Sequence, residues 1–423
     1  MSLRHNTIWN LAGSGVPLIA AVAFIPFTLN RLGNEAFGVL TLIWALIGYF
    51  SLFDMGVGRA LTYELSKLDK KKNSVEISLT LKAGLLLTLL AGLFGAIVML
   101  VLAPYLANSW LKISPALMQD AMVSFKIAAM GIVLTTITSG LRGAFEGLGR
   151  FAESNLNKMF LGFCMFVLPA FSIVLHGNQL CMITLYLILA RLVVFTVAVL
   201  QLNNYLFLRT SISVISYFKP LLSYGVWITV SGIVGPLMIF GDRFFVSASV
   251  GAALLPIYAI PQEGLIRLLM IPAALCGALL PQLTAMNSKN AAIIFKKNYK
   301  RVAVIMFGVC FLAALLAYPT LKWWLSEGFA KNALPIVLIL CVGVWLNSIA
   351  LVSLTLLHAN GNTKLTAFFH IFELALYVLT LWWLVNNFGL IGAAFAWVGR
   401  VALDLALLHI AANKILINTH ENS

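Results

Sequence analysis

The chain contains an internal repeat, with six apolar segments in each half and similar residues between them. The turn 147–150, with the sequence Gly-Leu-Gly-Arg, is matched by 361–364, Gly-Asn-Thr-Lys, at an offset of about 214 residues. Pro104 and Pro319 lie at nearly the same offset. A doubled block of apolar helices is typical of transporters whose halves move against each other around a site between them.

The composition indicates that the outer surface faces lipid. Hydrophobic residues make up 61% of the 423 residues and charged residues only 10%, whereas soluble domains have about 25% charged residues. Most soluble enzymes are thereby excluded. The five cysteines lie in apolar runs without metal-ligand spacing, so we expect neither a metal site nor a disulfide.

Crossing the hydrocarbon takes about 20 apolar residues in a helix. The sequence predicts twelve such helices, near residues 7–30, 36–66, 77–103, 117–141, 153–175, 179–203, 218–240, 251–284, 296–319, 329–357, 363–386 and 389–414. The predicted fold is therefore an all-α integral membrane protein with two six-helix lobes, residues 1–208 and 209–423. All loops are short, which leaves no room for a catalytic domain in water.

The positive charges lie mainly on one side of the predicted membrane. Of the 28 lysines and arginines, 17 lie on the side of the N-terminus and 5 on the other, including Arg243, while the rest lie within spans. Because cytoplasmic loops are rich in these residues, both termini are predicted to be cytoplasmic. The same distribution explains the net charge of +14 as topology, so we expect no nucleic-acid partner.

Charged residues within the predicted spans are the candidate functional residues, because each costs roughly 3 kcal/mol or more in hydrocarbon. They are Asp54, Arg59, Lys126, Arg191, Glu263, Arg267, Glu373, Arg400 and Asp404. Glu263 with Arg267, and Arg400 with Asp404, are four residues apart and are predicted to pair on their own helices. Whether these two arginines are structural or contact a substrate stays open at this point.

Arg191 and Asp54 differ from these pairs because their helical neighbours include no residue of opposite charge. A partner for Arg191 must come from another helix, from water or from a ligand. Arg59 lies near the cytoplasmic end of its span, where it could anchor to lipid headgroups or contact a substrate. Guanidinium groups suit phosphate oxygens because they present planar paired donors.

The two lobes differ in charge within their spans. The first has a net charge of +2 and the second a net charge of −1. This difference indicates an anion site in the first lobe and a carboxylate-based cation site in the second. Glu373, with His370 nearby on its helix, is the best candidate for the cation site, and a hydrogen-bonded structural glutamate is the alternative.

Three stretches near the N-terminus resemble a known family. They are 6–17, beginning Asn-Thr-Ile-Trp-Asn, then 32–38, Leu-Gly-Asn-Glu-Ala-Phe-Gly, and 52–60, Leu-Phe-Asp-Met-Gly-Val-Gly-Arg-Ala. Together they resemble the start of the polysaccharide transporter family, the Wzx-type O-antigen flippases. The two Gly-x-x-Arg/Lys turns resemble that family as well.

The resemblance implies two six-helix bundles arranged in a V around a cavity that opens to each side in turn. Such proteins are believed to move undecaprenyl-diphosphate-linked oligosaccharides from the cytoplasmic to the outer leaflet of the bacterial inner membrane. By helix position, Arg59 and Arg267 match substrate-contacting arginines of similar lipid II flippases. Glu373 is compatible with a ligand for a coupling ion, H⁺ or Na⁺; no other cofactor is expected.

The expected partners are membrane lipids, the lipid-linked glycan, and the polysaccharide polymerase with its chain-length machinery. A multidrug cation antiporter of the same superfamily is the main alternative, although arginines without local partners disfavour cationic substrates. An integral-membrane polymerase or acyl-type enzyme is disfavoured by the short loops. A major-facilitator transporter is disfavoured because its Gly-x-x-x-Asp-Arg-x-Gly-Arg turn is absent between the second and third spans.

Overall fold

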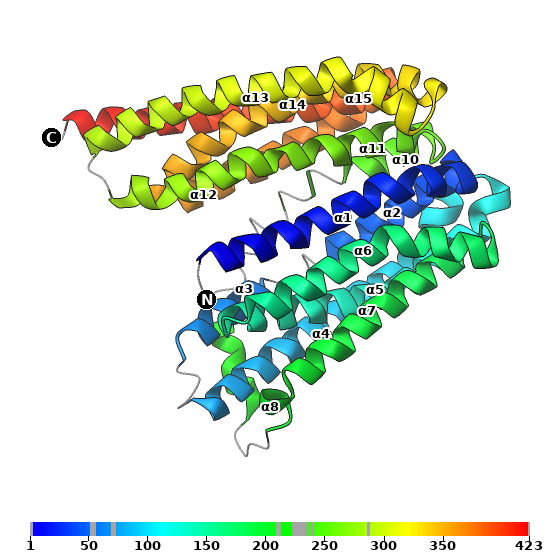
Figure 1. Cartoon of the computed structure of the whole chain (residues 1–423), viewed down its shortest axis with the longest axis horizontal. Coiled ribbons are helices and arrows are strands. Elements are labelled where there is room, and N and C mark those ends of the chain that lie inside the picture. Colours follow the sequence, from blue (N-terminus) through cyan, green and yellow to red (C-terminus); the bar gives the residue numbers. More distant parts are fainter. Residues whose placement is uncertain are drawn as a thin grey trace. The chain divides into compact units, whose positions relative to one another are not determined.

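The structure, a computed structural model, describes residues 3–50, 56–68, 73–208, 213–221, 234, 237–238, 241–285 and 288–421, and its regular elements there are all helices (Figure 1). They fall into two compact units, Met1–Pro236 and Leu237–Ser423, called here the first and the second unit. The predicted all-α class is confirmed. The predicted lobe boundary between residues 208 and 209 stays a prediction.

The first unit is organised around one long helix, α5. In chain order its elements are α1 (Leu3–Leu32), α2 (Asn34–Phe50), α3 (Val57–Ser66), α4 (Ser74–Tyr105), the π-helical turn η2 (Leu106–Trp110), α5 (Pro115–Gly147), α6 (Phe151–His176), α7 (Leu180–Gln201), α8 (Asn203–Leu206) and the 3₁₀ turn η3 (Val214–Tyr217). α5 packs against α2, α3, α4 and α7, while α1 packs against α6. Buried small residues of α5 such as Ala128, Gly140 and Gly143 allow these helices to approach closely.

The second unit has a matching central helix, α14. Its elements are α10 (Asp242–Val250), α11 (Leu255–Ile266), the 3₁₀ turn η4 (Arg267–Leu269), α12 (Met270–Ala285), α13 (Ser288–Trp324), α14 (Glu327–Ala359) and α15 (Thr363–Glu421). α14 packs against α11, α12, α13 and α15. Both α5 and α14 contain 33 residues, which agrees with the repeat seen in the sequence.

The turn after each central helix confirms the repeat in atomic detail. Gly149 and Gly361 have left-handed backbones, with φ of 66° and 75°. The Arg150 amide donates to the Phe145 carbonyl at 2.7 Å, and the Asn362 amide donates to the Leu357 carbonyl at 2.9 Å. Both turns are Schellman caps, which satisfy the last carbonyls of a helix and favour glycine at the left-handed position.

The count of twelve spans stays a prediction. Among the described residues, nine helices are long and apolar enough to cross a membrane, and Asn34–Ile47 is a shorter apolar helix. The single predicted helix 36–66 is wrong in part, because α2 and α3 are separate helices and α3 begins after Gly56, whose φ is 65°. Most of the predicted span 218–240 lies outside the described residues.

The predicted long helix 251–284 is divided into α11, η4 and α12. α15 runs over both of the last two predicted spans, with a kink at Gly389, where φ is 57° and ψ is −133°. The kink separates the two spans close to where the sequence placed their boundary. It brings residues from the two ends of α15 together in the second unit.

A close crossing of α3 and α5 fixes the position of Arg59. The Thr62 hydroxyl lies 3.1 Å from the Gly58 carbonyl of its own helix and 3.0 Å from the Gly143 carbonyl of α5. A Cβ atom added to Gly143 would collide with the backbone of Gly58. Small residues therefore set the helix spacing here, and Arg59, the next residue, remains exposed.

An acidic side chain fixes α7 against α5. Asp120 accepts hydrogen bonds from the backbone amides of Leu180 at 2.6 Å and Cys181 at 2.9 Å. These amides belong to the first turn of α7, where no carbonyl within the helix can accept them. A carboxylate at a helix N-terminus is also favoured by the helix dipole. Arg191 of α7 is thereby held in register with α5.

Candidate functional site

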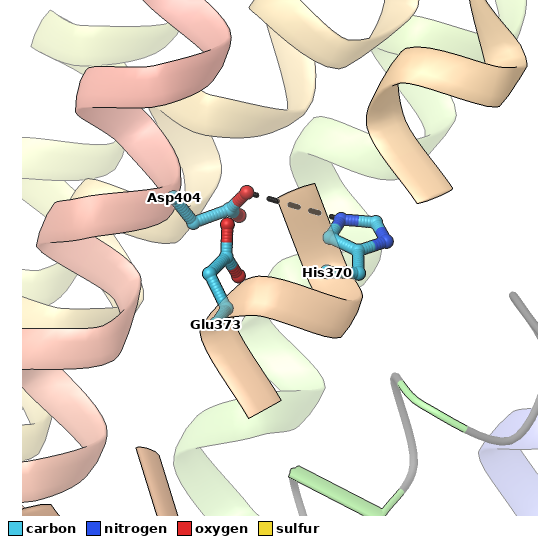
Figure 2. A group of neighbouring side chains, drawn as sticks. All are labelled: His370, Glu373 and Asp404. Atoms are coloured by element: carbon cyan, nitrogen blue, oxygen red, sulfur yellow. Dashed lines mark ion pairs between the residues drawn. The ribbon is translucent and has the colours of Figure 1, made fainter. Parts of the chain in front are cut away.

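The second unit contains a buried cluster of charged side chains on α15 (Figure 2). The ligand atoms of His370, Glu373 and Asp404 all lie within 4.8 Å of one another. His370 Nε2 is 3.8 Å from Asp404 Oδ1, and Arg400 Nη1 is 3.9 Å from Glu373 Oε2. Glu373 is fully buried and Asp404 is 7% exposed. Because His370 and Glu373 precede the kink and Asp404 follows it, the fold of α15 creates the cluster.

The two carboxyl groups of this cluster have few polar contacts. Neither oxygen of Glu373, nor Oδ1 of Asp404, has a hydrogen-bond partner in the part of the chain that the structure describes. Leaving a buried polar group without a partner costs about 1–3 kcal/mol, and more for a charged group. Two neighbouring carboxylates also repel each other. A proton or a small cation between them would relieve both penalties, which makes this cluster a candidate cation site.

The predicted pair of Arg400 with Asp404 is wrong. Arg400 instead lies nearest to Glu373, and its Nη1 is also 3.8 Å from the sulfur of Met238. Spacing along one helix predicts only local partners, whereas the kink presents Glu373 from the preceding segment. Asp404 is left to face His370 and Glu373.

The predicted ion pair of Glu263 with Arg267 is confirmed, and the structure shows that Glu263 has a second cationic partner, Arg243. Glu263 Oε1 is 2.9 Å from Arg267 Nη2, and its Oε2 is 2.8 Å from Arg243 Nη2. Arg243 is only 4% exposed, so its assignment to an outer loop was wrong: it lies in the first turn of α10. Because Glu263 already has two arginine partners, it is a weaker ion ligand than Glu373.

A second buried carboxylate, Asp242, was missed by the sequence analysis because it follows directly on a predicted span. Its Oδ2 accepts hydrogen bonds from the Tyr258 hydroxyl at 2.5 Å and from Gln262 Nε2 at 2.7 Å, and the Tyr377 hydroxyl lies 3.5 Å away. Asp242 is fully buried. Tyr258 and Gln262 lie one helical turn apart on α11, a polar pair that could have signalled a buried partner.

Arg191 of the first unit is held without a carboxylate. Its Nε donates to the Thr135 hydroxyl of α5 at 3.2 Å, and its Nη1 donates to the Leu187 carbonyl of its own helix at 3.2 Å. Within the described residues no carboxylate lies within 4.0 Å of Arg191. Of the three sources predicted for its partner, namely another helix, water or a ligand, the first is confirmed for Nε, because Thr135 provides that contact, whereas Nη1 has its partner on its own helix.

The other predicted cations of the first unit are exposed and lie on separate helices. Arg59 belongs to α3 and Lys126 to α5, and neither forms an ion pair within the described part of the chain. Asp54, the predicted carboxylate of this lobe, lies outside the described residues. Arg59 follows Gly58, which lies against Gly143 of α5, whereas Lys126 is 17 residues earlier on α5, so these two cations lie far apart along that helix.

The sequence matches a known family over most of its length. A family model described as a polysaccharide biosynthesis protein matches residues 3–287. A putative O-antigen transporter from Shigella flexneri is 31% identical over 412 residues, which cover 96% of this chain and 97% of that protein.

Solved structures show the fold. The chain is similar to an inward-facing multidrug resistance MATE family transporter of the MOP superfamily, with a TM-score of 0.80 and 15% identity over 100% of this chain and 97% of the other. It is also similar to a MOP superfamily transporter from Pyrococcus furiosus, with a TM-score of 0.68 and 14% identity over 98% and 95% of the two chains. At these identities the likeness shows the fold alone. The family match and the O-antigen transporter relative place this chain in the polysaccharide biosynthesis protein family.

Proposed function

We propose that the chain is a flippase that moves an undecaprenyl-diphosphate-linked oligosaccharide from the cytoplasmic to the periplasmic leaflet by alternating access. The oligosaccharide is an O-antigen unit or the repeat of another surface polysaccharide. The single observation that carries this proposal is the 31% identity to a putative O-antigen transporter along nearly the whole chain. Flipping forms and breaks no covalent bond, so the chain acts as a transporter and not as an enzyme.

The diphosphate is recognised by cations that lack carboxylate partners. Arg191 leads this group, because its described contacts are a hydroxyl and a carbonyl, and planar guanidinium donors suit phosphate oxygens. Arg59 and Lys126, exposed on α3 and α5, are secondary contacts for the diphosphate or the glycan. Arg267 and Arg400 are weaker candidates, because Glu263 and Glu373 lie beside them.

Transport is coupled to H⁺ or Na⁺ at the buried carboxylates of α15. Glu373 and Asp404 supply the ligands, and His370 completes the group. Binding of a cation here stabilises one conformation of the second unit, which is how an ion gradient biases alternating access. Glu263 and Asp54 are the secondary candidates, the first weakened by its two arginine partners.

A multidrug cation antiporter is the second candidate, favoured by the solved structure of a multidrug resistance transporter with this fold. Cationic substrates require carboxylates or aromatic rings rather than arginines. The cationic residues of the first unit therefore favour the phosphate-bearing substrate.

The proposed setting is the bacterial inner membrane with both termini in the cytoplasm, consistent with the distribution of Lys and Arg, which is 17 to 4 once the buried Arg243 is left out. In that setting the glycan is delivered to a polysaccharide polymerase and its chain-length machinery. Labelling of single cysteines introduced at the termini with a membrane-impermeant reagent tests this orientation. Labelling from the periplasmic side would contradict it.

The direct test is analysis of lipid-linked sugars after depletion of the protein from its host. We expect undecaprenyl-diphosphate oligosaccharide to build up on the cytoplasmic leaflet while one surface polymer is lost. The accumulated lipid would also identify the glycan. Absence of build-up together with new sensitivity to cationic compounds would favour the drug-exporter function instead.

A further inference from the structure

An apolar groove runs along the first unit between α1, α6 and α7. Its volume is about 390 Å³, within the range of about 300–1,000 Å³ typical of small-molecule sites. Phe160 and Phe163 of α6 face Val193 and Val197 of α7 across it, and Val16 of α1 closes one side. All four of the facing side chains are exposed, so the groove is open along its length.

A polar pocket of about 240 Å³ continues the groove between α5, α6 and α7. Two cations line it, Arg142 from α5 and Lys158 from α6, and hydroxyl groups such as that of Thr138 lie beside them. Arg142 uses its Nε to contact Glu146 at 3.0 Å. A guanidinium has five N–H donors, and the two terminal nitrogens of Arg142 make no hydrogen bond or ion pair within the described residues.

The groove and the pocket form one amphipathic site, because Asn157 and Val194 line both of them. Asn157 is oriented by its Nδ2, which lies 3.3 Å from Gln201 Oε1. A ligand that filled both spaces would have an apolar chain beside α6 and α7 and an anionic, oxygen-rich group at the end of α5.

A third cation, Arg191, lies next to the polar pocket. Ser154 lines the pocket and is 6% exposed. Thr135 also lines the pocket and accepts the hydrogen bond from Arg191 at 3.2 Å. Arg191 therefore lies directly behind the pocket and adds a third positive charge to it.

We propose that this site docks the polyprenyl-diphosphate end of the lipid-linked glycan, with the diphosphate in the polar pocket and the first isoprene units in the groove. The inference rests on the proposed function and adds a place where the lipid is held within the first unit. Charge complementarity supports this occupant. A diphosphate carries more than one negative charge, and the side chains of Arg142, Lys158 and Arg191 together supply three positive charges. The branched apolar chain matches walls of Phe and Val.

The test measures binding of undecaprenyl diphosphate to the full-length protein in phosphatidylcholine nanodiscs. Val193→Trp fills the groove and Lys158→Gln removes a pocket cation, and each is expected to weaken binding about tenfold, equivalent to about 1.4 kcal/mol. Lys158→Arg is expected to retain binding. Leu185→Trp, an exposed position on α7 two turns from Val193 and outside the groove, is the matched control and is expected to bind as the wild type does.

Several outcomes would overturn the site. One is that Val193→Trp and Lys158→Gln bind undecaprenyl diphosphate as the wild type does, while thermal unfolding shows that both are folded. If Val193→Trp does not fold, Val197→Trp takes its place in the test. Displacement of the probe by phosphatidylglycerol as readily as by undecaprenyl phosphate would show an ordinary phospholipid site. Displacement by inorganic diphosphate alone at similar concentration would show that the groove takes no part.

Failure of the site and failure of the proposed function are distinguishable. If the wild-type gene restores surface polymer to a depleted strain and the wild-type protein binds the probe, unchanged binding by the variants rejects only this site. If the wild-type protein does not bind the probe and depletion does not alter the lipid-linked sugars, the flippase function itself is rejected.

Discussion

In the first unit Arg191 is held by a hydroxyl and a backbone carbonyl, whereas in the second unit Arg243 and Arg267 share the carboxylate of Glu263. The same central-helix scaffold thus carries a partly buried arginine without a carboxylate partner among the described residues in the first unit, and arginines beside carboxylates in the second. A repeated scaffold therefore does not imply a repeated site. This difference is the basis on which we propose anion binding in the first unit and cation binding in the second.

The largest effect is expected when Arg191 is replaced by Ala. Loss of charge-assisted hydrogen bonds to a diphosphate, worth about 3 kcal/mol at the upper end, corresponds to about a hundredfold lower transport. Surface polysaccharide, measured in a strain that lacks the native gene, should be lost while the protein stays in the membrane. Arg301→Ala, which removes an exposed arginine of α13, is the control. Normal surface polymer in Arg191→Ala cells would remove the anion site from the first unit.

A smaller effect, specific to the driving ion, is expected for Glu373→Gln. The amide preserves the shape of the side chain but removes the charge that we propose holds H⁺ or Na⁺ beside Asp404. Uptake of lipid-linked sugar into vesicles should fall about tenfold, consistent with loss of about 1.4 kcal/mol, and should no longer respond to the imposed gradient.

The control for this variant is Glu327→Gln, at an exposed glutamate that pairs with Lys322 at 3.0 Å and Lys331 at 2.9 Å. It should keep both the rate and the ion dependence of the wild-type protein. If Glu373→Gln kept the same ion dependence as the wild type, the coupling site would have to lie elsewhere, and the assignment of cation binding to this cluster would be wrong.

Tyr258→Phe tests whether the Asp242 network is structural. The change removes a 2.5 Å hydrogen bond to a fully buried carboxylate and should lower the free energy of unfolding by about 1.5–3 kcal/mol. Thermal unfolding in detergent measures the change. Tyr186→Phe, which removes an exposed contact to His176 at 3.1 Å, should have little effect. Equal stability of the two variants would mean that Asp242 has another partner in the native membrane.

The sequence predicts the helical scaffold well because a helix that crosses a membrane requires a long run of apolar residues, which is visible in the sequence itself. Apolar runs of sufficient length predict the all-α class, and the matched turns around Gly149 and Gly361 predict the repeat, which the two Schellman caps confirm. The pair of Glu263 with Arg267 is predicted for the same reason, since both residues lie on one helix.

The sequence does not predict which residues of different helical segments contact each other. The pairing of Arg400 depends on the kink at Gly389, which presents Glu373 to it, and helical spacing contains no information on such partners. Arg243 and Asp242 were placed wrongly or missed because they follow the end of an apolar run. The hydroxyl beside Arg191 comes from α5, more than 50 positions earlier in the chain.

The smallest expected effects concern the scaffold itself. Gly149→Ala and Gly361→Ala each place a Cβ atom on a left-handed residue, with φ of 66° and 75°, which costs about 1–2 kcal/mol. Because the two caps have the same hydrogen bonds, the two losses in the free energy of unfolding should agree within about 0.5 kcal/mol. Gly264→Ala, in α11 with open space around the added Cβ, should be neutral or slightly stabilising. A large loss in the free energy of unfolding at only one of the two caps would mean that the two turns share sequence and backbone geometry but contribute differently to stability. The two units would then differ in the stability of their scaffolds as well as in charge.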